Sequence, residues 1–245
     1  MNTPAIVQLH GNGPDGAGLW QLELDAADFS SPVPEQHWHV YFEDPDLGLT
    51  VGAWTTTPMQ EAFGPYPGDE FMIILQGDVL ISDGEGGETP VPQGSSFAIR
   101  NGLPVSWVQK DFCRKFFVIH DPPNRGNSIS DEDGSPLVVF PQNNWVPGAQ
   151  EVDPPARQEA VLFRNDSGTM RAGVWRSAPF EGAMRTTSQH ELVHLLSGEF
   201  VITEAAGTIH KFAAGDVFFV PAGTTCSWQA GVPVHKQFCL IEPAG

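Results

Sequence analysis

The stretch SQHELVHLLSGEF, residues 188–200, can form a helix or a strand, and the choice between them decides the fold. It contains the pattern H-E-x-x-H at His190, Glu191 and His194, which binds zinc when it lies on a helix. Ser188 and Glu191 would make a capping box for such a helix. Read alone, the stretch therefore indicates a helical zinc site and a zinc hydrolase.

The chain repeats itself after 121 residues, so the same stretch can be inspected twice. Residues 42–122 align without a gap with residues 163–243, and 18 of these 81 pairs of positions are identical. The sequence therefore predicts two copies of one domain. The expected divisions are an N-terminal arm over 1–36, a first domain over 37–122, a linker over 123–157 and a second domain over 158–245, with a short strand in each connecting segment, at 5–9 and 136–140.

The first copy resolves the ambiguity of the quoted stretch. Its equivalent, residues 67–79, reads PGDEFMIILQGDV, which is rich in β-forming residues and too short for an ordinary helix. Because two copies of one domain share a fold, we predict strand, turn and strand in both. On a strand His190 and His194 would lie about 13 Å apart and could not share a zinc ion. The zinc hydrolase remains only a minor alternative.

Composition narrows the class of protein. The 26 glycines and 22 prolines are scattered along the chain, as expected for many short strands joined by turns. A net charge of −18 repels phosphate backbones, so nucleic acid is not an expected partner. No apolar run reaches membrane-spanning length and the N-terminus lacks a signal-peptide pattern, so we expect a cytoplasmic protein without a membrane partner. Three cysteines without a short-spaced pair give no disulfide framework.

Two spaced motifs recur in each copy. The first is Glu-x6-Gly, and the second is Gly-x5-Pro-x-Gly, whose proline is replaced by Arg100 in the first copy. The motif residues are Glu70, Gly77, Glu191, Gly198, Gly94, Gly102, Gly215, Pro221 and Gly223. In this order the motifs resemble those of the cupin superfamily. Both copies also share a G-x-W-x3-P segment at 52–58 and 173–179, a tryptophan after the second motif and a K-x-F near the end. These marks resemble the branch named after ureidoglycine aminohydrolase and ethanolamine-utilisation proteins. The resemblance implies an all-β fold of two tandem cupin barrels, jelly-roll-like double-stranded β-helices, each with a pocket at its open end.

The resemblance also implies where a metal would bind. Related proteins place histidine and glutamate ligands at four positions, which here hold Gly64, Tyr66, Glu70 and Val105 in the first copy and Arg185, Thr187, Glu191 and Cys226 in the second. One carboxylate per copy does not hold a divalent ion against water. We therefore expect no metal and no other cofactor. A separate His-x-His at His37 and His39 precedes the expected place and is interpreted as two histidines on one face of an edge strand.

A glutamate and a lysine persist in both copies at unchanged spacing. In each copy the lysine alternates with a phenylalanine along the chain, so its side chain is expected to point into the barrel. An unpaired buried charge is costly. Our hypothesis is that Glu70 pairs with Lys115, and Glu191 with Lys236, where the metal would otherwise be. The alternative is that each lysine extends to the rim and buries only its stem.

The second copy has the more polar set of inner residues and is the expected functional barrel. Glu191 and Lys236 are its catalytic candidates, and Cys226 is either a nucleophile or an inert buried thiol. The repeated tryptophans either form core and pocket wall or stack on a ligand. The expected pocket residues are Arg185, Thr187, Val193, Cys226 and Trp228 in the second copy and Tyr66, Glu70, Trp107 and Lys115 in the first.

Three functions compete. The first is binding of a small polar, and through Arg185 and Lys236 anionic, metabolite in the second barrel. The second is an enzyme of the aminohydrolase or isomerase kind, acting on a small nitrogenous or carboxylate compound with Glu191 as acid and base. The third, a structural or storage role, is disfavoured by the polar inner residues. The fold alone does not choose among them, and a homodimer of the two-barrel chain is an open option.

Overall fold

The computed structural model describes residues 5–123, 135–141, 150–151 and 157–243, and its regular structure is almost entirely strand. The exceptions are two 3-10 turns, η1 (Pro14–Gly16) and η2 (Ala26–Asp28). No helix in these ranges is long and apolar enough to cross a membrane. The chain divides into two compact units, Leu9–Gln142 and Met1–Gln8 with Asn143–Gly245. The all-β class predicted from the sequence is confirmed.

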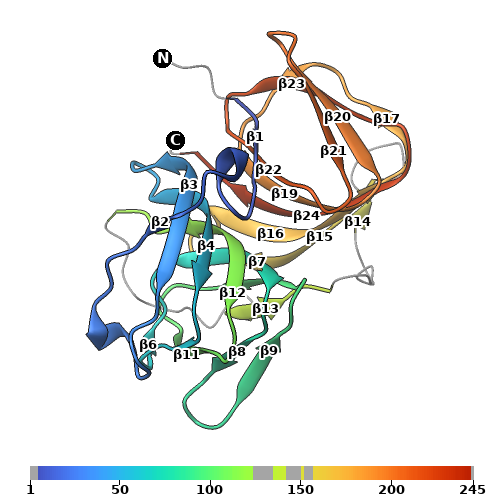
Figure 1. The fold of residues 1–245 in the computed structure, drawn as a ribbon. Helices are drawn as coiled ribbons and strands as arrows, with labels where there is room; N and C mark the ends of the chain where they lie inside the picture. Colours follow the sequence, from blue (N-terminus) through green and yellow to red (C-terminus); the bar gives the residue numbers. More distant parts are fainter. Residues whose placement is uncertain (1–4, 124–134, 142–149, 152–156, 244–245) are drawn as a thin grey trace. The chain divides into compact units, whose positions relative to one another are not determined.

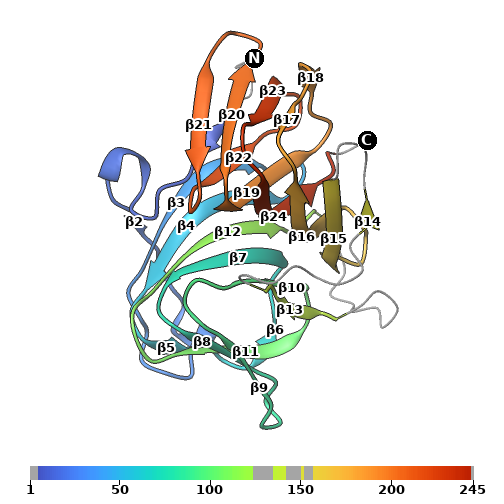
Figure 2. The same ribbon diagram turned by 90° about the vertical axis from the view of Figure 1, so that its right-hand side faces the viewer.

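The first unit is a barrel of two antiparallel sheets, whose open end is visible in Figure 2. Its seven-stranded sheet has the order β13 (Leu137–Val139), β10 (Ser96–Ile99), β7 (Asp69–Gln76), β12 (Cys113–His120), β4 (Leu49–Thr56), β3 (Gln36–Asp44), β2 (Trp20–Gln21). The facing sheet has the order β5 (Met59–Gln60), β11 (Pro104–Gln109), β8 (Val79–Ser82), β9 (Glu88–Val91), with β6 (Gly64–Pro65) also paired to β11.

The second unit repeats this topology strand for strand (Figure 1). Its seven-stranded sheet has the order β1 (Val7–Gln8), β22 (Val217–Val220), β19 (His190–Ser197), β24 (Val234–Ile241), β16 (Met170–Ser177), β15 (Arg157–Arg164), β14 (Gln150–Glu151). The facing sheet has the order β17 (Phe180–Glu181), β23 (Thr225–Ala230), β20 (Glu199–Glu204), β21 (Ile209–Ala213), with β18 (Arg185–Thr186) also paired to β23.

The H-E-x-x-H stretch is the central strand β19, which pairs with β22 on one side and β24 on the other. The helix that a zinc hydrolase would require is therefore not formed. Alternation along β19 turns Glu191, Val193 and Leu195 to one face, and the last two belong to the buried core of the second barrel. His190 and His194 lie on the opposite face, as the strand interpretation predicts.

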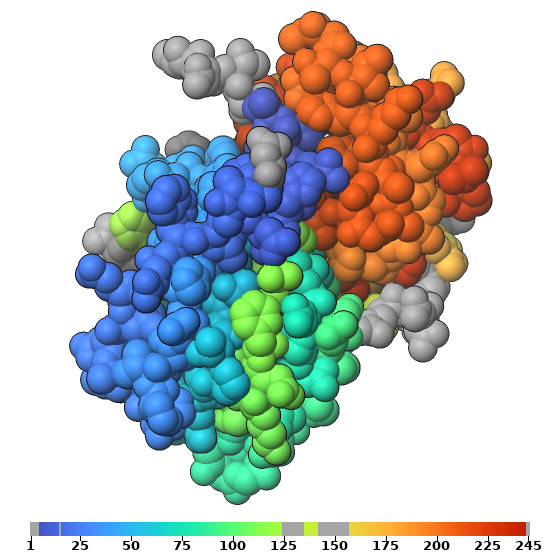
Figure 3. Space-filling view, viewed as in Figure 1, coloured from blue at the N-terminus to red at the C-terminus, as the bar shows by residue number. Residues whose placement is uncertain are grey.

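The two arm strands occupy equivalent edge positions in the two seven-stranded sheets. Each pairs with the sheet of the other domain, not with the domain that follows it directly in the sequence. β1 pairs with β22 of the second unit, while β13, from the segment between the repeats, pairs with β10 of the first. The rest of the N-terminal arm from Leu9 belongs to the first unit, where it forms part of the outer surface in Figure 3. Of the expected linker, residues 124–134, 142–149 and 152–156 lie outside the described ranges.

The glycine that ends the first motif is required by the turn between β19 and β20. Gly198 has φ 84°, and a Cβ there would lie 2.5 Å from the carbonyl oxygen of Pro233. Gly207 also has a positive φ, 91°, but a Cβ there would meet nothing within 4 Å. An alanine at Gly198 would thus suffer both backbone strain and a steric clash, whereas an alanine at Gly207 would suffer backbone strain alone.

We expect Gly198→Ala to lower the free energy of unfolding by more than about 2 kcal/mol, because strain and clash add. Gly207→Ala should cost only about 1 kcal/mol, because strain acts alone. Urea unfolding of the three proteins measures both values. Equal losses would show that the contact with Pro233 is not what fixes the glycine.

Candidate functional site

Glu70 and Lys115 meet inside the first barrel. Glu70 lies on β7 and Lys115 on the neighbouring β12, and the Lys115 Nζ is 2.7 Å from the Glu70 Oε1. Their side chains are only 5% and 9% exposed, so the lysine does not extend to the rim. The predicted pairing is therefore present in this barrel.

The ammonium group of Lys115 lies in a cage of rings. Its Nζ is 4.9 Å from the ring centroid of Trp54 and 4.8 Å from that of Trp107. It also lies 3.0 Å from the Met72 Sδ. Ring faces attract a cation, so the cage offsets part of the cost of burying the charge. The tryptophans thus serve as core and as partners of the lysine.

The second barrel contains the same unit. The Lys236 Nζ lies 2.5 Å from the Glu191 Oε1 and 5.0 Å from the ring centroids of both Trp175 and Trp228. The pairing predicted for this barrel is present as well. The Glu191 side chain is 19% exposed, so this carboxylate is the more open to solvent.

Tyr66 distinguishes the first site from the second. Its buried hydroxyl donates a hydrogen bond to the Glu70 Oε2, so both oxygens of that carboxylate are engaged. Burial, followed by the charges of Glu70 and Glu61, raises the pKa of Tyr66 well above its ordinary value. The second barrel has Thr187 here, and its hydroxyl donates instead to the Pro221 carbonyl oxygen at 3.0 Å.

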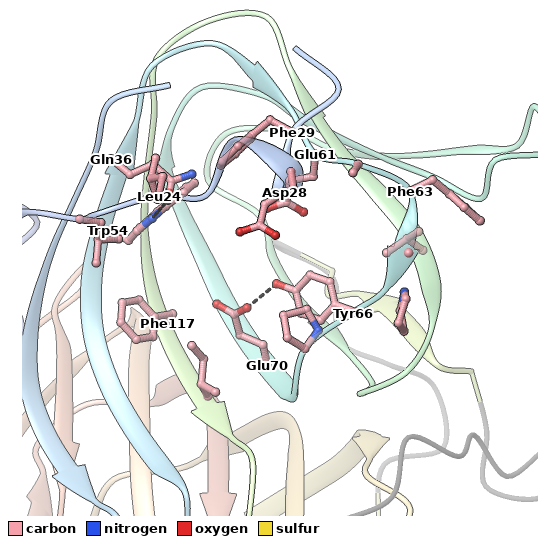
Figure 4. A pocket seen from close by; sticks show the side chains of 18 of the residues that line it. Leu24, Asp28, Phe29, Gln36, Trp54, Glu61, Phe63, Tyr66, Glu70 and Phe117 are labelled. Atoms are coloured by element: carbon pink, nitrogen blue, oxygen red, sulfur yellow. Dashed lines mark hydrogen bonds between the residues drawn. The ribbon is translucent and has the colours of Figure 1, made fainter. Parts of the chain in front are cut away.

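A cavity of about 680 Å³ lies over the Glu70–Tyr66 hydrogen bond in the first barrel (Figure 4). Its volume is in the range of small-molecule sites. Part of its wall comes from the N-terminal arm, which supplies Asp28 from η2 and Phe29 beside it. Asp28 and Glu61 lie side by side across the cavity from Glu70 (Figure 4). The other lining residues are Leu22, Leu24, Ala27, Gln36, Trp38, Trp54, Ala62, Phe63, Gly64, Pro65, Tyr66, Pro67, Val105, Lys115, Phe117 and Ile119.

Glu61 is the titratable group that sequence reasoning missed. Desolvation by burial is the main cause that raises its pKa to about 7, while the charge of Lys115 lowers it. Glu70 and Asp28 raise it further by like-charge repulsion. The equivalent position in the second copy is Gly182, so the repeat gave no signal for it. Its nearness to the Glu70 network is visible only in three dimensions.

Three of the residues predicted to surround Glu191 lie in one core cluster, which contains Val193 and Cys226 with Trp228 packed against it. Arg185 is exposed on β18, while Val193 is fully buried core. Cys226 is buried, and desolvation raises the pKa of its thiol, which opposes the nucleophile interpretation. Trp228 packs edge to face on Phe200 with ring centroids 5.1 Å apart.

The histidines of the H-E-x-x-H stretch have structural partners. The buried His190 accepts a hydrogen bond at Nδ1 from the Ala222 backbone nitrogen, 3.2 Å away. The Nδ1 of His194 is 3.3 Å from the Gln237 Oε1, and burial lowers the pKa of its imidazole. The strand β3, with His37 and His39, is not an edge strand as interpreted from the sequence, because β2 pairs with it at Trp38 and His37.

A metal at the position implied by the cupin resemblance does not fit these residues. In each barrel the carboxylate that would bind it already accepts from a lysine ammonium, which would repel a cation. Nowhere in the described ranges do three or more histidine, cysteine, aspartate or glutamate side chains form a group that could hold a metal ion.

Comparison with known proteins agrees with this architecture. Residues 164–238 match the model of the EutQ-like cupin domain. A protein of unknown function of the DUF861 family from Pseudomonas syringae pv. tomato is 23% identical, with a TM-score of 0.74 over 97% of this chain and 99% of that one. A search of curated proteins gives no match.

Two more distant structures share the fold. A cupin 2 conserved barrel domain protein from Leptotrichia buccalis is 11% identical, with a TM-score of 0.60 over 87% of this chain and 92% of that one. Salicylate 1,2-dioxygenase from Pseudoaminobacter salicylatoxidans is 14% identical, with a TM-score of 0.56 over 80% and 72%. Residues 164–238 therefore match a cupin domain of the EutQ-like type, and the two units share one fold, which is that of the cupin barrel structure named above.

Replacing one partner of the buried ion pair should be costly. We expect Lys115→Met to lower the free energy of unfolding by about 3–5 kcal/mol, because Glu70 is left buried without its cation. Lys236→Met should cost less, because the more exposed Glu191 can be solvated by water. Urea unfolding measures both, and the double variant Glu70→Gln with Lys115→Met should recover much of the loss. A larger loss for Lys236→Met would contradict this order.

Glu61 should make stability depend on pH. Its pKa is about 7 in the folded protein against 4.5 as the ordinary value, so the folded state holds the proton longer. The free energy of unfolding should therefore fall as pH rises from about 4.5 to about 7. Glu61→Gln removes this term and should gain up to about 3 kcal/mol over the parent protein above pH 7. Urea unfolding from pH 5 to pH 8 measures the gain, and Glu88→Gln, an exposed change in the same barrel, should show none.

Proposed function

We propose that this protein binds a small organic molecule in the cavity of its first barrel. The observation that carries the proposal is the cavity of about 680 Å³ above a buried network of Glu70, Lys115 and Tyr66. Ring and aliphatic side chains form most of its lining, with a few polar groups gathered near its floor and one wall. This is the usual composition of a small-molecule site.

The first barrel replaces the second as the favoured site. The sequence pointed to the second barrel because its inner positions hold more polar residue types. In the structure Arg185 is exposed, and Phe180 packs on Trp175 and Phe200 with ring centroids 6.0 and 6.4 Å away. The polar groups of the first barrel, by contrast, border one shared space (Figure 4).

Gly64 is a position at which an added side chain should narrow the cavity. It lines the cavity, and a Cβ there would meet nothing within 4 Å. The other copy has Arg185 at the equivalent position, which shows that the fold accepts a long side chain there. Gly64→Phe should therefore be tolerated by the barrel and place a ring at the edge of the cavity, where it narrows the space open to a ligand.

A panel of small cationic, neutral and anionic metabolites can be screened by thermal shift against the parent protein. A ligand at about a hundred times its Kd should raise Tm by several degrees. The shift should disappear in Gly64→Phe and persist in Gly231→Phe, where the added side chain also meets open space but lies in the second unit. A shift that survives in Gly64→Phe would place the ligand elsewhere and contradict the proposal.

An acid–base enzyme is the second candidate, because a glutamate with a pKa of about 7 suits proton transfer at neutral pH. Glu61 would be its acid and base in the first barrel. The version predicted from the sequence assigns that role to Glu191 beside Lys236, in an aminohydrolase or isomerase reaction. NMR of any bound ligand separates these. Consumption that is lost in Glu61→Gln or in Glu191→Gln identifies an enzyme and its barrel, whereas binding without consumption supports the binding protein.

A further inference from the structure

The cavity of the first barrel carries an excess of negative charge. Its charged lining residues are Asp28, Glu61, Glu70 and Lys115, so three carboxyl groups share it with one ammonium. The ammonium is taken by Glu70 at 2.7 Å. Within the described part of the chain neither Asp28 nor Glu61 forms a salt bridge. Two carboxyl groups therefore border the cavity without a cation of their own.

Lys115 is poorly placed to attract an anionic ligand. Its ammonium group is engaged by the Glu70 carboxylate, the Met72 sulfur and the faces of Trp54 and Trp107. An anion would have to compete with Glu70 for it and would also face the other two carboxyl groups. The charge balance thus opposes an anionic ligand in the cavity of the first barrel.

The uncharged amide in the cavity wall is also committed. Gln36 accepts a hydrogen bond from the Trp54 Nε1 at 3.2 Å and donates to the Met59 Sδ at 3.2 Å. This leaves Asp28 and Glu61 as the polar side chains most available to a ligand. They lie next to each other, and Asp28 raises the pKa of Glu61 by like-charge repulsion. A cation between them would relieve that repulsion.

The rest of the lining suits a cation with an apolar body. Aromatic rings at Phe29, Trp38 and Phe117 border the same space. Carboxylates and ring faces together attract ammonium and guanidinium groups. The protein already holds an ammonium in such surroundings twice, at Lys115 and Lys236, each against one carboxylate and two tryptophan rings.

The carboxyl group of Glu61 has no counterpart at the equivalent position of the second copy. The positions of Glu61 and Gly64 are held by Gly182 and Arg185 in the second copy, which loses a carboxyl group and gains a cation there. The shared glutamate and lysine therefore do not set the charge of the cavity. The residues around them do.

We infer that the cavity of the first barrel is selective for an organic cation, a molecule with an ammonium or guanidinium group between Asp28 and Glu61 and an apolar or aromatic body against the ring wall. This inference rests on the proposed function and adds the charge class of the ligand.

Three probes of similar size test it by isothermal titration calorimetry: 2-phenylethylamine, 2-phenylethanol and 3-phenylpropanoate. The amine should bind at least about tenfold more tightly than the alcohol or the carboxylate. Asp28→Asn and Glu61→Gln should each weaken the amine several-fold and leave the alcohol unchanged. The control Asp111→Asn removes an exposed carboxylate outside the cavity and should change neither.

A ligand whose charge does not change with pH shows the effect of Glu61 ionisation on affinity without any contribution from ionisation of the ligand. The groups that face Glu61 are Asp28, Glu70, Lys115 and Tyr66. Since Glu61 loses its proton near pH 7, benzyltrimethylammonium should bind several-fold more tightly at pH 8 than at pH 6, and Glu61→Gln should abolish the difference.

The outcomes distinguish this inference from the proposed function. Equal or tighter binding of the alcohol or the carboxylate, sensitive to Gly64→Phe, would overturn the cation selectivity and leave the binding site in place. Binding of the amine that is unchanged in Gly64→Phe would overturn both. Failure of all three probes to bind would also overturn the cation selectivity, whereas the broad metabolite panel decides the proposed function separately.

Discussion

A buried lysine held by one carboxylate and two tryptophan rings is the interaction around which each barrel is arranged. Removing an ammonium from water is expensive, and only close partners on several sides offset that cost. In both barrels these partners come from separate strands: the glutamate from β7 or β19, one tryptophan from β4 or β16 and the other from β11 or β23. Satisfying the charge therefore requires that both sheets close in the correct register.

This constraint explains which positions the two copies share and which have diverged. Glutamate, lysine and the two tryptophans are identical because each depends on the other three. Residues that contact this group differ between the copies: Thr187 corresponds to Tyr66, and Val193 corresponds to Met72. The result is a carboxylate with both oxygens engaged in the first barrel and a more exposed one in the second. The same group of glutamate, lysine and two tryptophans therefore lies beneath different surroundings in the two barrels.

Much of the fold could be predicted because the repeat supplies two independent views of every shared element. The strand β19, the inward direction of the lysines and their pairing with the glutamates all followed from residues that recur. The cavity could not be predicted in this way. Asp28 lies in the arm, which is not repeated, and the position of Glu61 is occupied by Gly182 in the second copy. Counting polar residue types at inner positions favoured the second barrel. The number of polar residue types does not measure open space. It also included Arg185 among the inner residues, although this arginine is exposed on the short strand β18.

The lysine also limits the chemistry that either barrel can perform. A metal at this place would offer exchangeable positions to a ligand, whereas an ammonium fixed by a carboxylate and two rings offers a charge that is already satisfied. What remains reactive is the surrounding set of carboxyl groups, and in the first barrel burial keeps Glu61 poised between its two protonation states near pH 7. Binding a cation there would favour the ionised form, and binding a neutral molecule would favour the protonated one. Ligand recognition and proton exchange at Glu61 are therefore coupled, so a single measurement of how affinity changes with pH reports on both.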